Sequence, residues 1–232
     1  MSIINFGGAG ATPLRKLHEF VAHATAVKCV ALSPLTGRLL ATGGEDKKVN
    51  IWRVGSPASV WSLGGNSTSV EHVGFDSEEH FVVSGSKGGA LKVYDLNEGR
   101  VSRSLPGHRS TVTSMHYHPF GDFVASGSVD TNVKIWDVRK KSCIQTYKGH
   151  EGHDVTAVRF SPDGRWVVSA AKDGGLKVWD LTSGKLLHSW HLSGRTTHVT
   201  SLVFNPAEFI LAAATTERVV RLYDLETFEL MG

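Results

Sequence analysis

A histidine, a hydroxyl residue, an aspartate and a tryptophan recur together three times in this chain of 232 residues. Ser, His and Asp are the residue types of nucleophilic hydrolysis, in which His removes the hydroxyl proton and Asp orients the His. The indole N–H of the tryptophan adds a fourth polar group. The three sets are His23, Thr42, Asp46 and Trp52; His108, Ser126, Asp130 and Trp136; and His150, Ser169, Asp173 and Trp179.

The regular register of these sets argues against catalysis. In every set the hydroxyl residue stands ten positions before the tryptophan, and the aspartate stands six before it. An active site needs one such set, and the chain lacks the G-x-S-x-G turn that exposes a nucleophilic serine. A carboxylate, imidazole, hydroxyl and indole can instead satisfy one another in a buried hydrogen-bond network. We interpret the sets as structural and expect the chain not to be an enzyme.

The sets are positioned by a repeat whose aromatic residue returns every 42 to 44 positions, at Trp52, Tyr94, Trp136, Trp179 and Tyr223. This period is typical of four-stranded propeller blades. Within the third unit, β-branched and aromatic runs at 112–117, 123–128, 133–136 and 143–147 predict four short strands. No segment has a convincing helical period, so we expect an all-β fold.

We predict a flexible N-terminal tail over 1–13 and a propeller domain over 14–232. Its blade units are 22–64, 65–106, 107–148, 149–193 and 194–232. The second unit has Asn66 and Gly88 in place of His and Asp, and the fifth has Gly194-Arg195, Ala213 and Glu217. We expect backbone pairing and packing alone to hold these two blades.

The two ends of the array indicate how the ring closes. Propellers have four to eight blades and avoid exposed sheet edges. The segment 14–21 (LRKLHEFV) has strand character and precedes the first unit, as the outer strand of a closing blade would. We therefore expect five blades of an incomplete six- or seven-bladed ring. The alternative is a complete five-bladed ring in which this segment finishes the fifth blade.

Composition narrows the environment. The chain has only two cysteines, far apart in sequence, which argues against a disulfide framework and favours a reducing compartment. Neither a secretory signal nor a long apolar stretch is evident. We expect a cytoplasmic protein with no membrane contact. His116 and His118 form an H-x-H pair without a third ligand, so we expect no metal and no cofactor.

The repeat pattern resembles the WD40-repeat family and, within it, the non-catalytic WD-repeat regulatory subunits of katanin, the microtubule-severing complex. The resemblance lies in residues 16–23, 37–52, 121–150, 160–187 and 219–230. It implies a regulatory and targeting role at the cytoskeleton, on microtubules and at the centrosome, spindle pole or basal body. It also implies binding to the AAA-type catalytic subunit through a C-terminal helical region that this sequence does not contain.

Seven cations are predicted on one face of the propeller, in the loops entering the innermost strands and the turns before the aromatic strands. We expect this face to bind an acidic partner such as tubulin tails or a spindle-pole or centrosomal protein; the alternative is an ordinary solvated surface. Nucleic acid is disfavoured because the aromatic residues fall at core positions. The seven cations are Lys47, Lys48, Lys87, Arg109, Lys172, Arg195 and Arg218.

The alternative to a katanin-like function is that of a generic adaptor, such as a ubiquitin-ligase substrate receptor.

Overall fold

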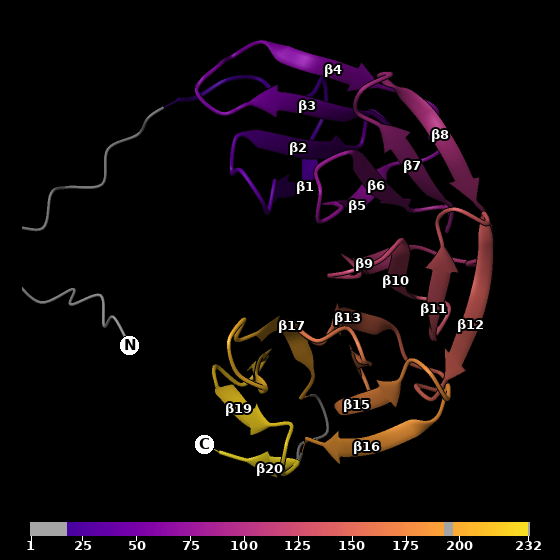
Figure 1. Ribbon diagram of the computed structural model, residues 1–232, viewed down its shortest axis with the longest axis vertical. Helices are drawn as coiled ribbons and strands as arrows, with labels where there is room; N and C mark the ends of the chain where they lie inside the picture. The colour runs from indigo at the N-terminus through magenta and orange to yellow at the C-terminus, as the bar shows by residue number, and fades with distance from the viewer. Residues whose placement is uncertain (1–17, 193–196, 232) are drawn as a thin grey trace, which may run out of the picture.

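The computed structural model describes residues 18–192 and 197–231, which form five four-stranded antiparallel sheets and no helix (Figure 1). The predicted all-β fold with five blades is confirmed. The first sheet has β1 (Val27–Leu32), β2 (Leu39–Gly44), β3 (Val49–Arg53) and β4 (Ser59–Leu63), and the second has β5 (Val70–Phe75), β6 (Phe81–Ser86), β7 (Leu91–Asp95) and β8 (Arg100–Leu105). The third has β9 (Val112–Tyr117), β10 (Phe123–Ser128), β11 (Asn132–Asp137) and β12 (Ser142–Lys148). The fourth has β13 (Val155–Phe160), β14 (Trp166–Ala171), β15 (Gly175–Asp180) and β16 (Leu186–His191), and the fifth has β17 (Val199–Phe204), β18 (Ile210–Thr215), β19 (Val220–Asp224) and β20 (Glu229–Leu230).

Small residues in the second strand of each sheet allow neighbouring sheets to approach closely. β10 reads FVASGS and is almost entirely buried, whereas the outer strand β4 is almost entirely exposed. A Cβ added at Gly127 of β10 would lie 2.4 Å from a methyl group of Val155, in the innermost strand of the next sheet. The glycine is therefore required by sheet-to-sheet packing.

The five sheets follow one another along an arc, with β1, β5, β9, β13 and β17 lining its inner edge (Figure 1). Hydrogen bonds tie together the innermost strands of the third, fourth and fifth sheets. Thr113 Oγ1 donates to the Val155 carbonyl at 2.5 Å, and Thr156 Oγ1 donates to the Val199 carbonyl at 2.6 Å. Neighbouring sheets are thus joined by both apolar packing and polar contacts.

The first and fifth sheets stand apart at the two ends of the arc (Figure 1). Val30 of β1 is 64% exposed and Val203 of β17 is 59% exposed, whereas Val158 of the interior strand β13 is fully buried. The described residues therefore do not form the closed five-bladed ring that was the alternative expectation. The fourth strand of the fifth sheet is β20, which follows β19 in the sequence, and not the N-terminal segment.

The predicted outer strand 14–21 lies partly outside the described residues, as does the whole tail 1–13. Residues 18–21 form no strand in this structure. Instead the ring of Phe20 lies 4.5 Å from that of Trp52, centroid to centroid. The closing strand and the six- or seven-bladed ring remain predictions.

Candidate functional site

The His–Ser–Asp–Trp set of the third sheet is a continuous hydrogen-bond network. His108, in the loop before β9, lies 2.9 Å from Asp130 through Nδ1 and 2.7 Å from Ser126 through Nε2. The indole N–H of Trp136 donates to Ser126 Oγ at 2.7 Å. Because the ionised Asp130 can only accept, Nδ1–H donates to it, and Nε2 of the neutral ring accepts from the Ser126 hydroxyl. The network fastens the incoming loop to β10, β11 and the turn between them.

The first and fourth sheets contain the same network. His23 lies 2.9 Å from both Asp46 and Thr42, and Trp52 donates to Thr42 at 2.9 Å. In the fourth sheet, His150 lies 3.3 Å from Asp173 and 2.9 Å from Ser169, and Trp179 donates to Ser169 at 2.8 Å. The structure thus brings together all twelve residues of the predicted sets.

The hydroxyl groups in these networks are unsuited to nucleophilic attack. Ser126 and Ser169 are completely buried, and each hydroxyl bonds both an imidazole and an indole. A substrate carbonyl could reach neither oxygen without dismantling the network. The arrangement therefore serves to satisfy buried polar groups, and it leaves no hydroxyl of these sets open to a substrate.

The carboxylates in the networks are held in the charged form. Burial alone would raise the pKa of Asp173, but hydrogen bonds from His150 and the backbone N–H of Gly175 lower it to about 2. The pKa of Asp130 is also held below its usual range, against the effect of burial, by the backbone N–H of Arg109 and by His108. Burial lowers the pKa of His108 although Asp130 opposes that change. A neutral imidazole beside an ionised carboxylate matches the directions of the hydrogen bonds.

The second sheet has a different network, and the expectation that it lacks one was wrong. Asn66 Nδ2 donates to the Tyr94 hydroxyl at 2.7 Å and lies 3.5 Å from Ser84 Oγ. The backbone N–H of Gly88, at the aspartate register, is satisfied by Thr68 Oγ1 at 2.8 Å. An amide and a phenol thus replace the imidazole and indole. The shared register of Asn66 with His, and of Tyr94 with Trp, was the signal in the sequence.

The fifth sheet also has a side-chain link, so the same expectation was wrong there. The buried Thr197 donates its hydroxyl to Glu217, which stands at the aspartate register. Arg221 lies 3.8 Å from the other oxygen of the Glu217 carboxylate. Gly194-Arg195, which sequence alignment paired with the Gly-His dipeptides, lies outside the described residues. No repeat pattern in the sequence pointed to Thr197, because this residue lies outside the register that the network residues share.

Six of the seven predicted face cations are described, and all six are exposed; Arg195 lies outside the described residues. They lie in the loop before β9 and in the turns that precede β3, β7, β15 and β19. Lys172 forms an ion pair with Asp154 at 2.7 Å. The other five form no ion pair with a described residue. They are Lys47, Lys48, Lys87, Arg109 and Arg218.

Two of these cations occupy strained backbone positions. Lys47 and Arg218 each have a φ of 67°, while the equivalent turn positions in the second and fourth sheets are Gly89 and Gly174. Glycine adopts such angles without steric cost. Thr131 occupies the same position in the third sheet with a φ of 71°, so the strain belongs to the turn and not to the charge.

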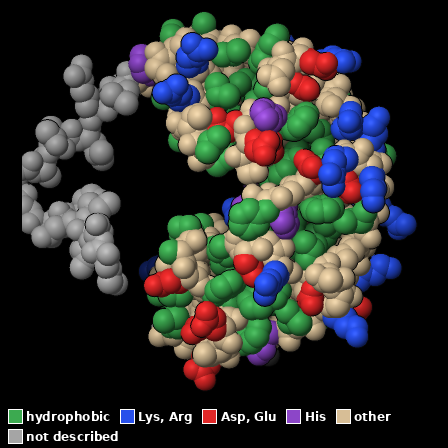
Figure 2. Space-filling model, in the orientation of Figure 1, with side chains coloured by type: hydrophobic (Ala, Val, Ile, Leu, Met, Phe, Trp, Pro, Cys, Tyr) green, Lys and Arg blue, Asp and Glu red, His purple; other side chains and the backbone are tan. Residues whose placement is uncertain are grey.

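Other features bound the chemistry of the surface. Over residues 18–192 and 197–231, no cluster of three or more His, Cys, Asp or Glu side chains could hold a metal ion. In the same ranges, no helix is long and apolar enough to cross a membrane. Figure 2 shows further Lys and Arg side chains along the outer rim formed by β8 and β12.

Comparison with known proteins identifies the repeat. The family model for the WD domain, G-beta repeat, matches residues 14–53, 57–95, 99–137, 141–180 and 184–224. From the second repeat on, each match begins just before the outer strand of one sheet and ends in the third strand of the next. By this register 14–21 occupies the position of an outer strand.

Similar curated proteins include katanin subunits. The katanin p80 WD40 repeat-containing subunit B1 homolog KTN80.3 of Arabidopsis thaliana is 51% identical over 74 residues, which are 32% of this chain and 9% of that protein. The Danio rerio katanin p80 WD40 repeat-containing subunit B1 is 48% identical over 77 residues, 33% of this chain and 11% of that protein. The Homo sapiens angio-associated migratory cell protein is 36% identical over 78 residues, 34% of this chain and 18% of that protein. These matches span only a small part of each relative. The five matched repeats, by contrast, cover most of this chain, and the chain therefore belongs to the WD40-repeat family.

Proposed function

We propose that the chain is a non-catalytic regulatory and targeting subunit of a katanin-like, microtubule-severing ATPase complex. The observation that carries this proposal is the 51% identity to a katanin p80 WD40 repeat-containing subunit over 74 residues. The identity to the angio-associated migratory cell protein is 36% over a stretch of similar length. The likeness to the katanin subunits thus exceeds the likeness to this relative, which has another name.

The polar networks support a role without catalysis. Their hydroxyl groups are buried, and the sheets present loops and turns around a rigid frame, as a protein-binding platform requires. ATP hydrolysis would then belong to an AAA-type catalytic subunit, bound through a region outside this sequence. The site of action would be cytoplasmic, on microtubules and at the centrosome, spindle pole or basal body.

The exposed cations favour an acidic partner on the face that bears them. Five of the six described cations are not neutralised by a described carboxylate. The acidic tails of tubulin have the complementary charge. Contacts between exposed charges weaken as salt screens them, so binding through this face should fall with ionic strength.

Charge reversal tests this face. We expect the variant Lys47→Glu, Lys48→Glu, Lys87→Glu, Arg218→Glu to co-sediment with microtubules roughly tenfold more weakly at low salt, since each exposed pair contributes up to about 1 kcal/mol. The matched control reverses four exposed cations in the turns before β2, β12 and β16, at the other end of the strands, with the same change in net charge. It carries Arg38→Glu, Lys140→Glu, Lys141→Glu and Lys185→Glu. Equal binding by the two variants would remove the basic face from the proposal.

Affinity purification from the source cell tests the assignment as a whole. Recovery of an AAA-type ATPase together with tubulin would support the katanin-like role. Recovery of ubiquitin-ligase components without either protein would support the alternative, a substrate receptor, and would overturn the proposal.

A further inference from the structure

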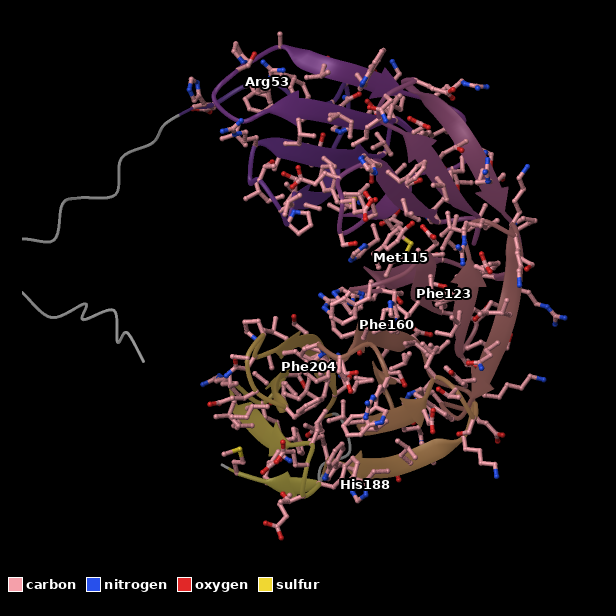
Figure 3. All side chains as sticks on the ribbon, in the orientation of Figure 1. Arg53, Met115, Phe123, Phe160, His188 and Phe204 are labelled. Carbon is pink, nitrogen blue, oxygen red and sulfur yellow. The ribbon has the colours of Figure 1, made fainter. Side chains whose placement is uncertain are left out.

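A cavity of about 630 Å³ opens at the inner edge of the arc, where the innermost strands end. It is lined by β1, β5, β9 and their following turns, together with Arg159 of β13. A second cavity of about 410 Å³ lies between the third, fourth and fifth sheets and shares His116 and Arg159 with the first. Figure 3 shows Met115, Phe160 and Phe204 along this inner edge, on three successive innermost strands.

Arg159 is a largely buried cation without a carboxylate partner among the described residues. One guanidinium nitrogen donates to the Val158 carbonyl at 2.8 Å and to Ser114 Oγ at 3.3 Å. Burial lowers the pKa of Arg159, and no charged neighbour offsets that effect. Arginine nonetheless remains protonated in proteins. Since an unpaired charge is costly to bury, an anion that pairs with Arg159 would offset the free-energy cost of burying its charge.

Two further polar groups at this cavity are unpartnered. His72 Nδ1 and the Tyr117 hydroxyl are both buried, and neither has a hydrogen-bond partner among the described residues. Both residues line the cavity. Buried polar atoms without partners are rare in folded proteins, and a ligand in the cavity would complete the bonding of these two.

Two of the three histidines that line the cavity, His72 and His116, can donate hydrogen bonds without adding charge. His116 Nδ1 accepts from the Phe160 backbone N–H at 3.1 Å, so the neutral ring carries its proton on Nε2. Burial and the nearby Arg159 lower the pKa of His72 to about 4 and that of His116 to about 3. At neutral pH, therefore, Arg159 is charged and both His72 and His116 are neutral.

The nearest acids are engaged elsewhere. Asp76 and Asp122 lie close enough to Tyr117 to add to the effect of burial in raising its pKa. The Asp76 carboxylate accepts from the Phe81 backbone N–H at 2.8 Å within its own turn, and Asp122 forms an ion pair with Arg139 at 3.2 Å. Another titratable group of the cavity wall, His118, bonds the Gly164 carbonyl at 3.0 Å. None of these groups neutralises Arg159.

The remaining lining selects the kind of anion. Val30, Leu32, Leu35, Phe75 and Met115 give the cavity apolar walls. One cation among apolar side chains suits a singly charged carboxylate on a peptide with apolar neighbours. A dianionic phosphate would need more positive charge than Arg159 supplies.

We propose that this cavity binds an acidic side chain of an extended peptide segment, with Arg159 as the charge partner and His72 and Tyr117 as hydrogen-bond partners. The site is distinct from the basic face, because the innermost strands begin at that face and end at the cavity. The inference goes beyond the proposed function and requires neither tubulin nor an ATPase.

Peptide binding to the complete chain tests the site. The probe is a fluorescein-labelled, capped pentapeptide, Leu-Gly-Glu-Gly-Leu, compared by fluorescence anisotropy with the same peptide carrying Gln. We expect the Glu peptide to bind roughly tenfold more tightly, as a charge-assisted hydrogen bond to a buried cation should give. The Arg159→Gln variant should bind the two peptides equally. Equal binding by the wild type would overturn the proposal, and so would a preference that survives in Arg159→Gln.

Two variants separate the site from folding. Arg103 is the matched control, because its guanidinium likewise donates to a neighbouring carbonyl and a serine hydroxyl, but on the outer strand β8. Arg103→Gln should keep the preference for Glu. Arg159→Lys retains the charge and should keep most of the preference; its complete loss in a folded Arg159→Lys protein would contradict the role of charge.

A competition arm distinguishes the source of the anion. Inorganic phosphate should displace the Glu peptide no better than acetate does at equal ionic strength. Displacement by phosphate at concentrations roughly tenfold lower would assign the site to a small inorganic anion and overturn the peptide proposal. The tubulin assay uses other residues, so the two proposals can fail independently.

Discussion

The second and third sheets occupy equivalent interior places in the arc but satisfy their buried polar groups differently. Each is flanked by a sheet on either side, and their second strands, β6 and β10, are buried alike. The third sheet has an ionised Asp130 bonded to His108, whereas the second has the uncharged pair Asn66 and Tyr94. The difference teaches that a side-chain network can link these places without a charge, and that one acceptor in it, Asn66 Oδ1, has no partner among the described residues.

Removing the central member of each network should produce the largest contrast. His108→Ala would leave Asp130 and Ser126 without their imidazole partner and should cost about 3 kcal/mol. Asn66→Ala should cost about 1 kcal/mol, because it removes only neutral hydrogen bonds. Urea denaturation measures the change in the free energy of unfolding of each variant. Hydrogen exchange of the native protein then shows whether the loss lies in the affected sheet.

His153 supplies the control for this comparison. It is exposed and lies close to the network residue His150 in sequence. His153→Ala should change stability by less than about 0.5 kcal/mol. Equal losses in His108→Ala and Asn66→Ala would show that the carboxylate does not make its network more demanding.

Acid should weaken the carboxylate networks and spare the neutral one. The pKa of Asp173 is about 2 in the folded state and 3.8 as an unperturbed group. Its contribution is therefore present above about pH 4 and is lost as the pH falls towards 2, on the order of 2 kcal/mol. The network of the second sheet, formed by Asn66, Ser84 and Tyr94, has no group that titrates in acid.

Denaturation at pH 5 and at pH 2.5 tests this sign. The wild type should lose more stability between the two values than Asp173→Asn does, because the variant has no carboxylate to protonate. The same loss in both proteins would contradict the assignment of acid sensitivity to this network.

The smallest expected effect concerns the turn before the aromatic strand. Thr131 of the third sheet has a φ of 71°, where the second sheet has Gly89. Thr131→Gly should stabilise the protein by about 0.5 kcal/mol, since relief of about 1 kcal/mol of strain exceeds the added entropy of the unfolded chain. Lys47→Gly should behave alike.

Lys48→Gly is the matched control for Lys47→Gly, because Lys48 is adjacent and does not have a positive φ. It should lower thermal stability slightly, by roughly 0.5 kcal/mol. A loss of stability in both Lys47→Gly and Thr131→Gly would mean that these turns are not strained.

Much of the fold could be read from local pattern. The strands predicted at 112–117 and 123–128 coincide with β9 and β10, because alternating β-branched residues and turn residues act within a few positions. The His, hydroxyl, Asp and Trp positions followed from one register. The link from Thr197 to Glu217 did not, because Thr197 falls outside that register and the contact depends on where the loop before β17 returns.

The sequence by itself determined the all-β class, the five repeats and the residues that form the His–Asp networks, since each is encoded by spacing within one repeat. Only the tertiary structure decided that Asn66 bonds Tyr94. The tertiary structure was also needed to show that the two ends of the arc stand apart and that His72, Tyr117 and Arg159 line one cavity. These three residues come from three different repeats, and only the stacking of sheets brings them together. That stacking is set by packing between repeats, which no spacing within a repeat encodes.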